Sequence, residues 1–166
     1  DFHGAERIIV SRTAPEVVAN LFKKEVPEVN SGAVEIKKVS REAGSRSKVA
    51  VESQRPGVDP VGSCVGQKGV RVQAVIEQIG GEKIDIVPFS ETPEKLIAAA
   101  LSPAEDVEVE VDEEEKKAVV KVAADQLSLA IGKEGQNVRL ATKLTGYKID
   151  IEEKEGDADN KKDEKE

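Results

Sequence analysis

The feature that most constrains this chain is a stretch that occurs twice, at residues 59–69 and 125–135, which lie 66 residues apart. In each copy an Asp is followed seven residues later by a glycine, two variable residues and a second glycine, in the sequences Gly66-Gln67-Lys68-Gly69 and Gly132-Lys133-Glu134-Gly135. An amphipathic helical pattern follows each copy, and then a short strand pattern with the sequence Ile-Asp-Ile. A duplication of this kind predicts two modules with the same fold.

The residues around the first copy predict an α+β module. Apolar residues at helical spacing follow the capping-box sequence Thr13-Ala14-Pro15-Glu16 and predict an amphipathic helix. Alternating patterns within residues 34–51 predict a hairpin. Asp59 followed by Pro60 predicts the N-terminus of a short helix, which the glycine loop separates from a longer one. Residues 83–87 then predict a final strand, so the order is helix, strand, strand, helix, helix, strand, with a three-stranded sheet.

The second module repeats this order. Pro93 opens a predicted helix, and Asp125 is predicted to cap the short helix before the second loop. Between them, alternating valines predict a hairpin whose outer face carries two facing charge pairs, Glu108 with Lys121 and Asp112 with Lys117. Opposite charges at facing positions offset part of the repulsion within the acidic strand. This hairpin therefore accounts for most of the acidic cluster without a binding partner.

These patterns divide the chain into four parts. Residues 1–12 are interpreted as the end of an upstream element or linker, 13–88 as the first module, 89–152 as the second, and 153–166 as a disordered acidic tail. Because the linker between the modules is short and each module can bury only a limited core, we expect the two to dock as a rigid pair.

The net charge of −8 is unevenly distributed. The acidic strand and the tail carry most of the negative charge, and the rest of the chain is net positive. Six Lys or Arg side chains against two Glu between Lys37 and Arg55 predict a basic stripe beside the first glycine loop. The net charge of the whole chain therefore does not exclude a nucleic-acid partner.

The sequence lacks the residues that metal binding, thiol catalysis and nucleotide hydrolysis require. The only histidine is His3 and the only cysteine is Cys64, so we expect no metal site and no catalytic thiol, and Cys64 is predicted to be a buried apolar residue. A single cysteine also favours a reducing, intracellular compartment. Neither loop matches the GxxxxGK[ST] sequence of nucleotide-hydrolysing loops. No apolar run approaches the roughly 20 residues that span a bilayer. We therefore expect a protein that is not an enzyme, has no cofactor and is cytoplasmic.

The repeated loop has a physical use. Glycines without Cβ atoms let a polyanionic backbone approach closely, and the free N–H groups at the start of the following helix favour a phosphate there. Such a loop would clamp a nucleic-acid backbone rather than read its bases.

The motifs identify the chain as similar to a known family. Residues 59–69 and Leu129 to Ala141, together with Leu101-Ser102-Pro103-Ala104 and Val10-Ser11-Arg12-Thr13, resemble the tandem KH domains of the NusA family, and the likeness covers roughly residues 8–152. It implies two prokaryotic-type (type II) KH domains that bind single-stranded RNA in consecutive grooves. It also implies nascent transcript as the RNA, RNA polymerase and other transcription factors as partners, and a monomeric protein that acts in transcription elongation, pausing, termination and antitermination.

The resemblance also implies which residues contact RNA. Lys68 and Lys133 would supply charge at the loops, Arg71 and Arg139 would project from the following helices, and Asn137 would bond a base or the backbone. The remaining implied contacts, which include an apolar groove under the bases at Val65 and Ile131, are Val65, Gly66, Gln67, Gly69, Ile131, Gly132, Glu134 and Gly135.

Two features qualify this interpretation. The Glu134 carboxylate opposes phosphate, so we expect Glu134→Gly to tighten binding. The polymerase-binding and oligonucleotide-barrel domains typical of the family do not appear in this sequence, apart from the stub before Thr13. The alternative function is a module that docks on RNA polymerase or another protein partner, through the acidic strand or tail, and has little RNA affinity of its own.

Overall fold

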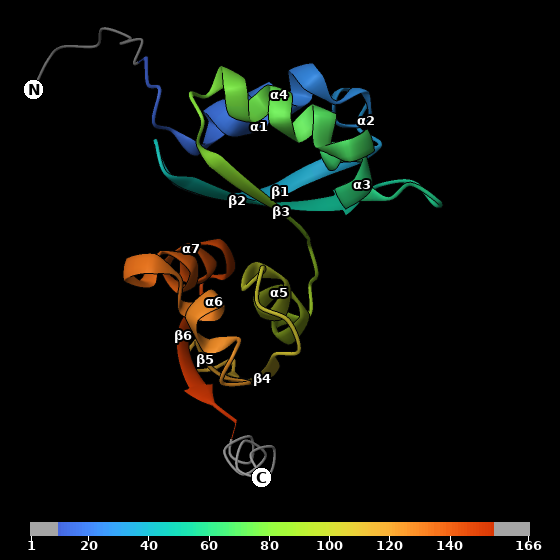
Figure 1. Ribbon diagram of the computed structural model, residues 1–166. Coiled ribbons are helices and arrows are strands. Elements are labelled where there is room, and N and C mark those ends of the chain that lie inside the picture. Colours follow the sequence, from blue (N-terminus) through green and yellow to red (C-terminus); the bar gives the residue numbers. More distant parts are fainter. Residues whose placement is uncertain (1–9, 155–166) are drawn as a thin grey trace, which may run out of the picture.

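The computed structural model describes residues 10–154 and shows two α+β modules that follow one another along the chain (Figure 1). Each module has a three-stranded sheet. The predicted fold class is therefore confirmed. His3 and most of the proposed tail lie outside the described residues.

The first module contains the predicted elements and one additional short helix. Its elements are α1 (Pro15–Glu25), α2 (Pro27–Asn30), β1 (Val34–Glu42), β2 (Arg46–Ser53), α3 (Pro60–Val65), the 3-10 turn η1 (Gln67–Gly69), α4 (Val70–Gln78) and β3 (Lys83–Pro88). The additional helix, α2, begins at a proline whose missing N–H would have no helical partner in any case.

The second module repeats the series without a counterpart of α2. Its elements are α5 (Pro93–Ala100), β4 (Glu108–Asp112), β5 (Lys117–Val122), α6 (Leu127–Ile131), the 3-10 turn η2 (Lys133–Gly135), α7 (Gln136–Thr145) and β6 (Lys148–Glu153). Strand β6 thus includes Glu153, one residue past the predicted end of this module.

Both sheets have the same topology. The central strand pairs antiparallel with the preceding strand and parallel with the following one, in the orders β1-β2-β3 and β4-β5-β6. In Figure 1 the helices of the first module cover one face of its sheet, and α5 and α7 of the second module lie against the other face. The first sheet is therefore covered on both faces.

The predicted register of the second hairpin is confirmed: Glu108 lies opposite Lys121 and Asp112 opposite Lys117. The ion pairs, however, are not between these facing residues. Lys121 pairs diagonally with Glu110 at 2.8 Å. Glu108 pairs with Lys154, just beyond β6, at 3.0 Å.

Two predicted helix caps are wrong. The N-cap of α1 is Ala14, and the hydroxyl of Ser11, rather than that of Thr13, accepts hydrogen bonds from the backbone there. The N-cap of α6 is Gln126, and no side chain caps this helix, so Asp125 does not serve as its cap. By contrast, Asp59 is the N-cap of α3, and its carboxylate accepts from the N–H of Val61 at 3.1 Å.

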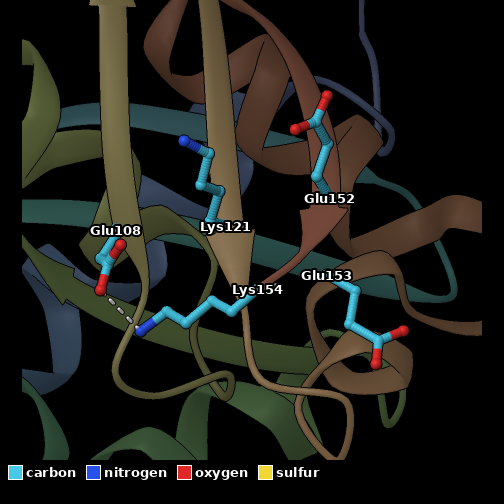
Figure 2. Close-up of a pocket in the computed structure, with 5 residues that line it drawn as sticks. All are labelled: Glu108, Lys121, Glu152, Glu153 and Lys154. Atoms are coloured by element: carbon cyan, nitrogen blue, oxygen red, sulfur yellow. Dashed lines mark ion pairs between the residues drawn. The ribbon is translucent and has the colours of Figure 1, made fainter. Parts of the chain in front are cut away.

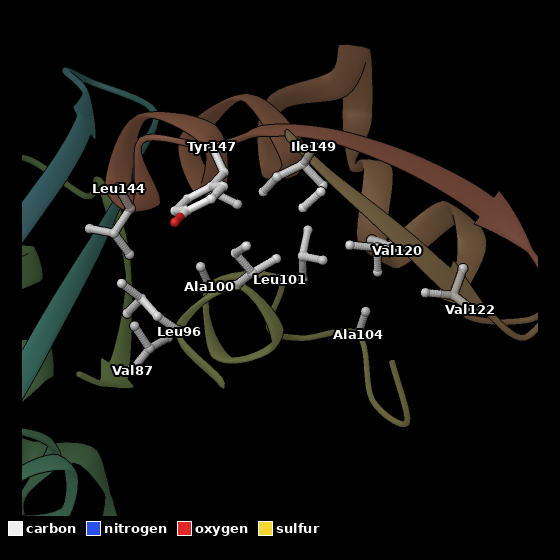
Figure 3. Packing of buried hydrophobic residues seen from close by; sticks show 14 of the residues in the cluster. Val87, Leu96, Ala100, Leu101, Ala104, Val120, Val122, Leu144, Tyr147 and Ile149 are labelled. Carbon is white, nitrogen blue, oxygen red and sulfur yellow. The ribbon is translucent and has the colours of Figure 1, made fainter. Parts of the chain in front are cut away.

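Each module has its own apolar core, but the core of the second extends into the first. The first core packs α1, α3 and α4 on their own sheet and buries Cys64 completely, as predicted. The second core includes Ala50 and Val87, which belong to the sheet of the first module. Figure 3 shows Val87 beside Leu96 of α5. The expected docking of the two modules is thus built on shared apolar contacts.

A buried charge cluster completes the contact between the modules. The ammonium of Lys48, whose side chain is fully buried, lies 3.1 Å from the carboxylate of Asp85 and donates to the carbonyl of Ser102 at 2.7 Å. Arg46 pairs with the same carboxylate at 2.7 Å. Because Ser102 belongs to the second module, Lys48 joins the two modules through a hydrogen bond as well as by packing.

Candidate nucleic-acid interface

The two glycine loops have almost the same backbone conformation. The first glycines, Gly66 and Gly132, have φ/ψ of 75°/171° and 76°/169°. The second glycines, Gly69 and Gly135, have 77°/11° and 72°/17°. The duplication in the sequence is therefore a duplication of one corner in space.

The third residue of each loop is also left-handed, although it is not glycine. Lys68 has φ/ψ of 52°/26°, and Glu134 has 54°/26°. Residues with a Cβ atom adopt this region uncommonly. Sequence reasoning missed this feature, because neither lysine nor glutamate signals a left-handed turn.

Hydrogen bonds close each corner in the same way. The N–H of the second glycine donates to the carbonyl of the first at 3.1 Å, both from Gly69 to Gly66 and from Gly135 to Gly132. Helices α4 and α7 begin at the next residue, with the second glycine as N-cap. Each corner therefore lies at the positive end of a helix, where a phosphate is favoured.

The side chains of the first loop divide into exposed and bonded groups. Gln67 and Lys68 are exposed, and Val65 at the end of α3 is half-buried. Arg71 does not project freely. One nitrogen of its guanidinium donates to the carboxylate of Glu28 at 2.9 Å and to the carbonyl of Ser63 at 2.7 Å.

The second loop has the same division. Lys133 and Glu134 are exposed. The apolar side chains beside the loop are open to solvent, with Leu129 44% and Ile131 37% exposed. Asn137 is only 2% exposed. Its amide donates to the carbonyls of Leu101, Leu129 and Ala130 at 2.9, 3.1 and 3.1 Å.

Two exposed apolar residues beside the loops are not among the contacts predicted from the sequence. Val70, at the start of α4, is 68% exposed, and Leu129 lies on α6 beside the second loop. The sequence does carry a signal for Leu129, because this residue stands in the short helix directly before the second glycine loop and within the family motif.

Arg139 joins the second loop to the first module. Its guanidinium donates to both carboxylate oxygens of Glu42, at 2.5 and 3.0 Å, and to the carbonyl of Glu134 in the loop at 3.0 Å. The amide of Gln136 donates to Glu42 at 2.9 Å and to Ser45 at 2.7 Å. These bonds from Arg139 and Gln136 lower the pKa of Glu42 to about 2. The carboxylate is therefore charged at neutral pH, and this contact holds the two modules together beside the loop.

The predicted basic stripe between Lys37 and Arg55 is not a free cationic surface. Lys48 is buried where the two modules meet, and Arg46 is paired with Asp85. Arg41 forms a buried pair with Glu82 at 3.0 Å, and both side chains are almost inaccessible. The sequence places these bases near one another, but most of them neutralise carboxylates within the protein.

Hollows adjoin both loops. One of about 510 Å³ is lined by Gly66, Gln67, Val70, Arg71 and neighbouring residues, and one of about 380 Å³ is lined by Gly132, Lys133, Gln136 and residues of the first module. A hollow of about 530 Å³ lies away from the loops, where Glu108, Glu152 and Glu153 surround Lys121 and Lys154 (Figure 2). Its three carboxylates make it unsuited to a polyanion.

The part of the chain that the structure describes offers few residues for other chemistry. Among residues 10–154, no group of three His, Cys, Asp or Glu side chains could hold a metal ion. Burial raises the pKa of the Cys64 thiol to about 11, which makes it a poor nucleophile at neutral pH. No helix in this range has the length and apolar character needed to cross a bilayer.

Comparisons with known proteins agree with this geometry. Residues 12–89 match the model of the NusA-like first KH domain, and residues 93–159 match that of the NusA-like second KH domain. A solved structure, "Crystal structure of APE1850", has a similar fold, with a TM-score of 0.55 and 23% identity over 82% of this chain and 95% of that one.

Curated relatives named "Transcription termination/antitermination protein NusA" are also similar. The proteins of Bacillus subtilis and Halalkalibacterium halodurans are 59% and 58% identical over 145 residues, which are 87% of this chain and 39% and 38% of those proteins. That of Thermus thermophilus is 55% identical over 148 residues, 89% of this chain and 38% of its own length. This chain thus spans less than half the length of these relatives. With both domain models matched in order, the chain belongs to the NusA family, as its tandem KH-domain region.

Proposed function

We propose that this chain binds single-stranded RNA at its two glycine corners. The observation that carries the proposal is the repeated backbone geometry: two corners with nearly equal dihedral angles, each at the N-terminus of an amphipathic helix. Ordinary turns have no reason to keep matching positive φ angles at three of four positions in both modules. A requirement that each module admit the backbone of a nucleic-acid strand explains why both loops keep this conformation.

The side chains around the corners supply the remaining chemistry. Lys68 and Lys133 are exposed beside the corners and would attract phosphates. Leu129, Ile131 and Val65 offer apolar surface to unstacked bases. In this proposal the corners fix the position of the strand, and the bases are read by contacts beside it.

The family suggests where this binding is used. The relatives are named for transcription termination and antitermination, and we propose that this chain contributes RNA contacts to such an activity. The RNA would be nascent transcript and the principal protein partner RNA polymerase. The chain would act in the cytoplasm, as a monomer and without catalysing a reaction.

Fluorescence anisotropy with a short unstructured RNA, at several salt concentrations, tests the proposal. Clamping of phosphates predicts that the logarithm of affinity falls with the logarithm of salt concentration, at a slope near −0.7 per phosphate neutralised. Changes in the amide chemical shifts on addition of the RNA should localise the contact at residues 66–69 and 132–135. An absence of binding at low salt would overturn the proposal and leave protein docking as the function. The same titration with duplex RNA is the control, since a corner that follows one flexible strand should prefer single-stranded RNA.

A further inference from the structure

Positions 71 and 137 are equivalent in the duplication, since they lie 66 residues apart, but they hold different residues. Both lie in the first turn of the helix after the loop. Arg71 is charged and Asn137 is neutral. The sequence alone therefore gives no sign that the two side chains share a role.

The structure shows that the two side chains make the same bond. Arg71 donates to the carbonyl of Ser63 at 2.7 Å, and Asn137 donates to the carbonyl of Leu129 at 3.1 Å. Ser63 and Leu129 are themselves 66 residues apart, each three residues before the first glycine of its loop. Because the glycine ends the short helix, these carbonyls are among those that lack a regular helical partner. In each module, the side chain after the loop supplies the missing donor.

The same side chains also support the first glycine. A Cβ atom on Gly66 would lie 2.7 Å from Cγ of Arg71, and one on Gly132 would lie 2.7 Å from Cβ of Asn137. Each corner thus rests directly on the side chain at this position. That contact requires glycine at the first position of the loop, in addition to the positive φ.

Each side chain has a further bond to the segment that ends or directly follows the first helix of its module. Arg71 reaches Glu28 in α2, which follows α1, at 2.9 Å. Asn137 reaches the carbonyl of Leu101, the C-cap of α5, at 2.9 Å. The two modules therefore hold the glycine loop in the same way, one with a guanidinium group and the other with a carboxamide.

We propose that Arg71 and Asn137 are positioning residues that set the shape of the glycine corners, and that neither is a phosphate contact. The proposal rests on RNA binding at the corners and adds the source of their shape. Asn137 is 2% exposed and cannot reach a strand outside. Since an uncharged residue does the same work in the second module, the charge of Arg71 is not needed in the first. The carboxylate of Glu28 already neutralises it.

An exchange between the modules tests this inference. Arg71→Asn gives the first module the same side-chain donor as the second module, whereas Arg71→Ala removes the donor. Lys68→Gln is the matched control, because it removes a charge that has no bond within the loop. The first readout is the set of amide NMR shifts of residues 66–69 in the protein without RNA. The second is RNA affinity and its salt slope, measured in a chain that carries Gly135→Asp to silence the second loop.

A positioning role predicts that Arg71→Ala moves the loop amides of the free protein and that Arg71→Asn restores them. It also predicts that Arg71→Asn keeps the salt slope of the parent and an affinity within about twofold. Arg71→Ala should weaken binding roughly tenfold, because the partly buried carbonyl of Ser63 loses its donor and the loop loses its shape. Lys68→Gln should change the free amides only at residue 68 and its direct neighbours, leave the amide of Gly66 unchanged, and make the slope shallower by about 0.7.

Two results would overturn the inference. One is a behaviour of both Arg71 variants like that of Lys68→Gln, with an unchanged amide shift at Gly66 and a shallower slope. The other is a failure of Arg71→Asn to restore the amides that Arg71→Ala moves. If the parent chain does not bind RNA, the proposed function fails, but the amide shifts of the free protein still decide whether Arg71 shapes the loop.

Discussion

At the scale of single residues, the two glycines of each loop have different reasons to be glycine. The first has no room for a Cβ atom, because the side chain at position 71 or 137 lies against it. The second has room: a Cβ on Gly69 or Gly135 would make only ordinary contacts, at 3.9 and 4.0 Å. A substitution at the second glycine therefore changes the charge of the corner with less damage to its packing.

The double variant Gly69→Asp with Gly135→Asp should weaken RNA binding at least tenfold, because two carboxylates then stand at helix N-termini where phosphates would bind. Thermal unfolding should show a loss of no more than about 1–2 kcal/mol per site, the usual cost of a left-handed residue with a Cβ. Anisotropy and calorimetry measure the two effects.

Gly57→Asp is the control for this pair, since Gly57 also has a positive φ of 78° with open space around it but is not part of either glycine loop. Its RNA affinity should equal that of the parent. Gly66→Asp with Gly132→Asp should weaken binding too, but with larger losses of stability, since the new side chains clash. Full affinity in the Gly69/Gly135 variant would place the RNA elsewhere.

The Glu134 carboxylate should oppose RNA at the second loop, where Lys68 stands in the first. We expect Glu134→Gly and Glu134→Gln to tighten RNA binding by roughly threefold, the scale of one exposed charge interaction. Glu134→Gly also relieves the left-handed conformation, so the glutamine variant isolates the effect of charge. A titration in which the glutamine variant binds no more tightly than the parent would refute the repulsion.

Sequence reasoning reached the glycines and the exposed lysines of the loops because these depend on local signals. It did not predict the hydrogen-bond partners of Arg71, Asn137 and Arg139. Their partners are Glu28, Leu101 and Glu42, which lie 36 to 97 residues away in the chain. A helical pattern indicates which side chains face away from the core, but not which carboxylate or carbonyl the fold brings opposite them.

At the scale of elements, the order of helices and strands was predictable because each is marked by periodicity or by a turn. The ends were less so. Asp59 and Asp125 occupy equivalent positions before the two loops, yet only Asp59 caps a helix. The difference follows from Pro60, which fixes the first turn of α3 and has Gln126 as its counterpart.

Substitution of these two residues should separate them. Asp59→Ala should lower the free energy of unfolding by about 1 kcal/mol, the typical value of an N-cap. Asp125→Ala, the matched control, should change it by less than about 0.5 kcal/mol, as for an exposed residue without such a role. Urea denaturation measures both, and equal losses would contradict the assigned caps.

The contact between α7 and the first hairpin depends on one charged carboxylate. The pKa of Glu42 is held at about 2, well below its ordinary value of 4.5, by bonds from Arg139 and Gln136. A lowered pKa means that this contact contributes its full stability above about pH 4.5 and loses it as the pH falls through about 2.

Carbon-13 NMR of the side-chain carboxyls can follow this titration. We expect the Glu42 resonance to titrate near pH 2 in the parent and at a higher pH in Arg139→Gln, where the bond from Gln136 remains. A midpoint of Glu42 that does not move in the variant would show that Arg139 is not its partner in solution.

At the scale of the whole molecule, the two modules share a core. Ala50 and Val87 of the first sheet belong to the apolar core of the second module, so that core is incomplete without the first module. The duplication predicted two modules and the short linker predicted docking, but the face used for docking was not predicted. It is visible only when strands that are distant in sequence are placed in register.

Val87→Ala should therefore destabilise both modules together. Large-to-small changes of this kind remove buried apolar contacts, and we expect a loss of about 1–3 kcal/mol. Hydrogen exchange should show faster opening in both sheets. Val109→Ala, a half-buried position in the second sheet only, is the comparison. Faster exchange confined to the first module in Val87→Ala would indicate that the modules unfold independently.

The register of the two sheets carries one more consequence. Ala50 and Val87 pair across the first sheet, and their counterparts in the second sheet are Lys121 and Glu152, which pair in the same way. Where the first sheet offers methyl groups to its neighbour, the second offers charges that line an open hollow (Figure 2). A third copy of this fold could not stack on the second as the second stacks on the first. Any further protein that meets this surface must do so through ionic or hydrated contacts.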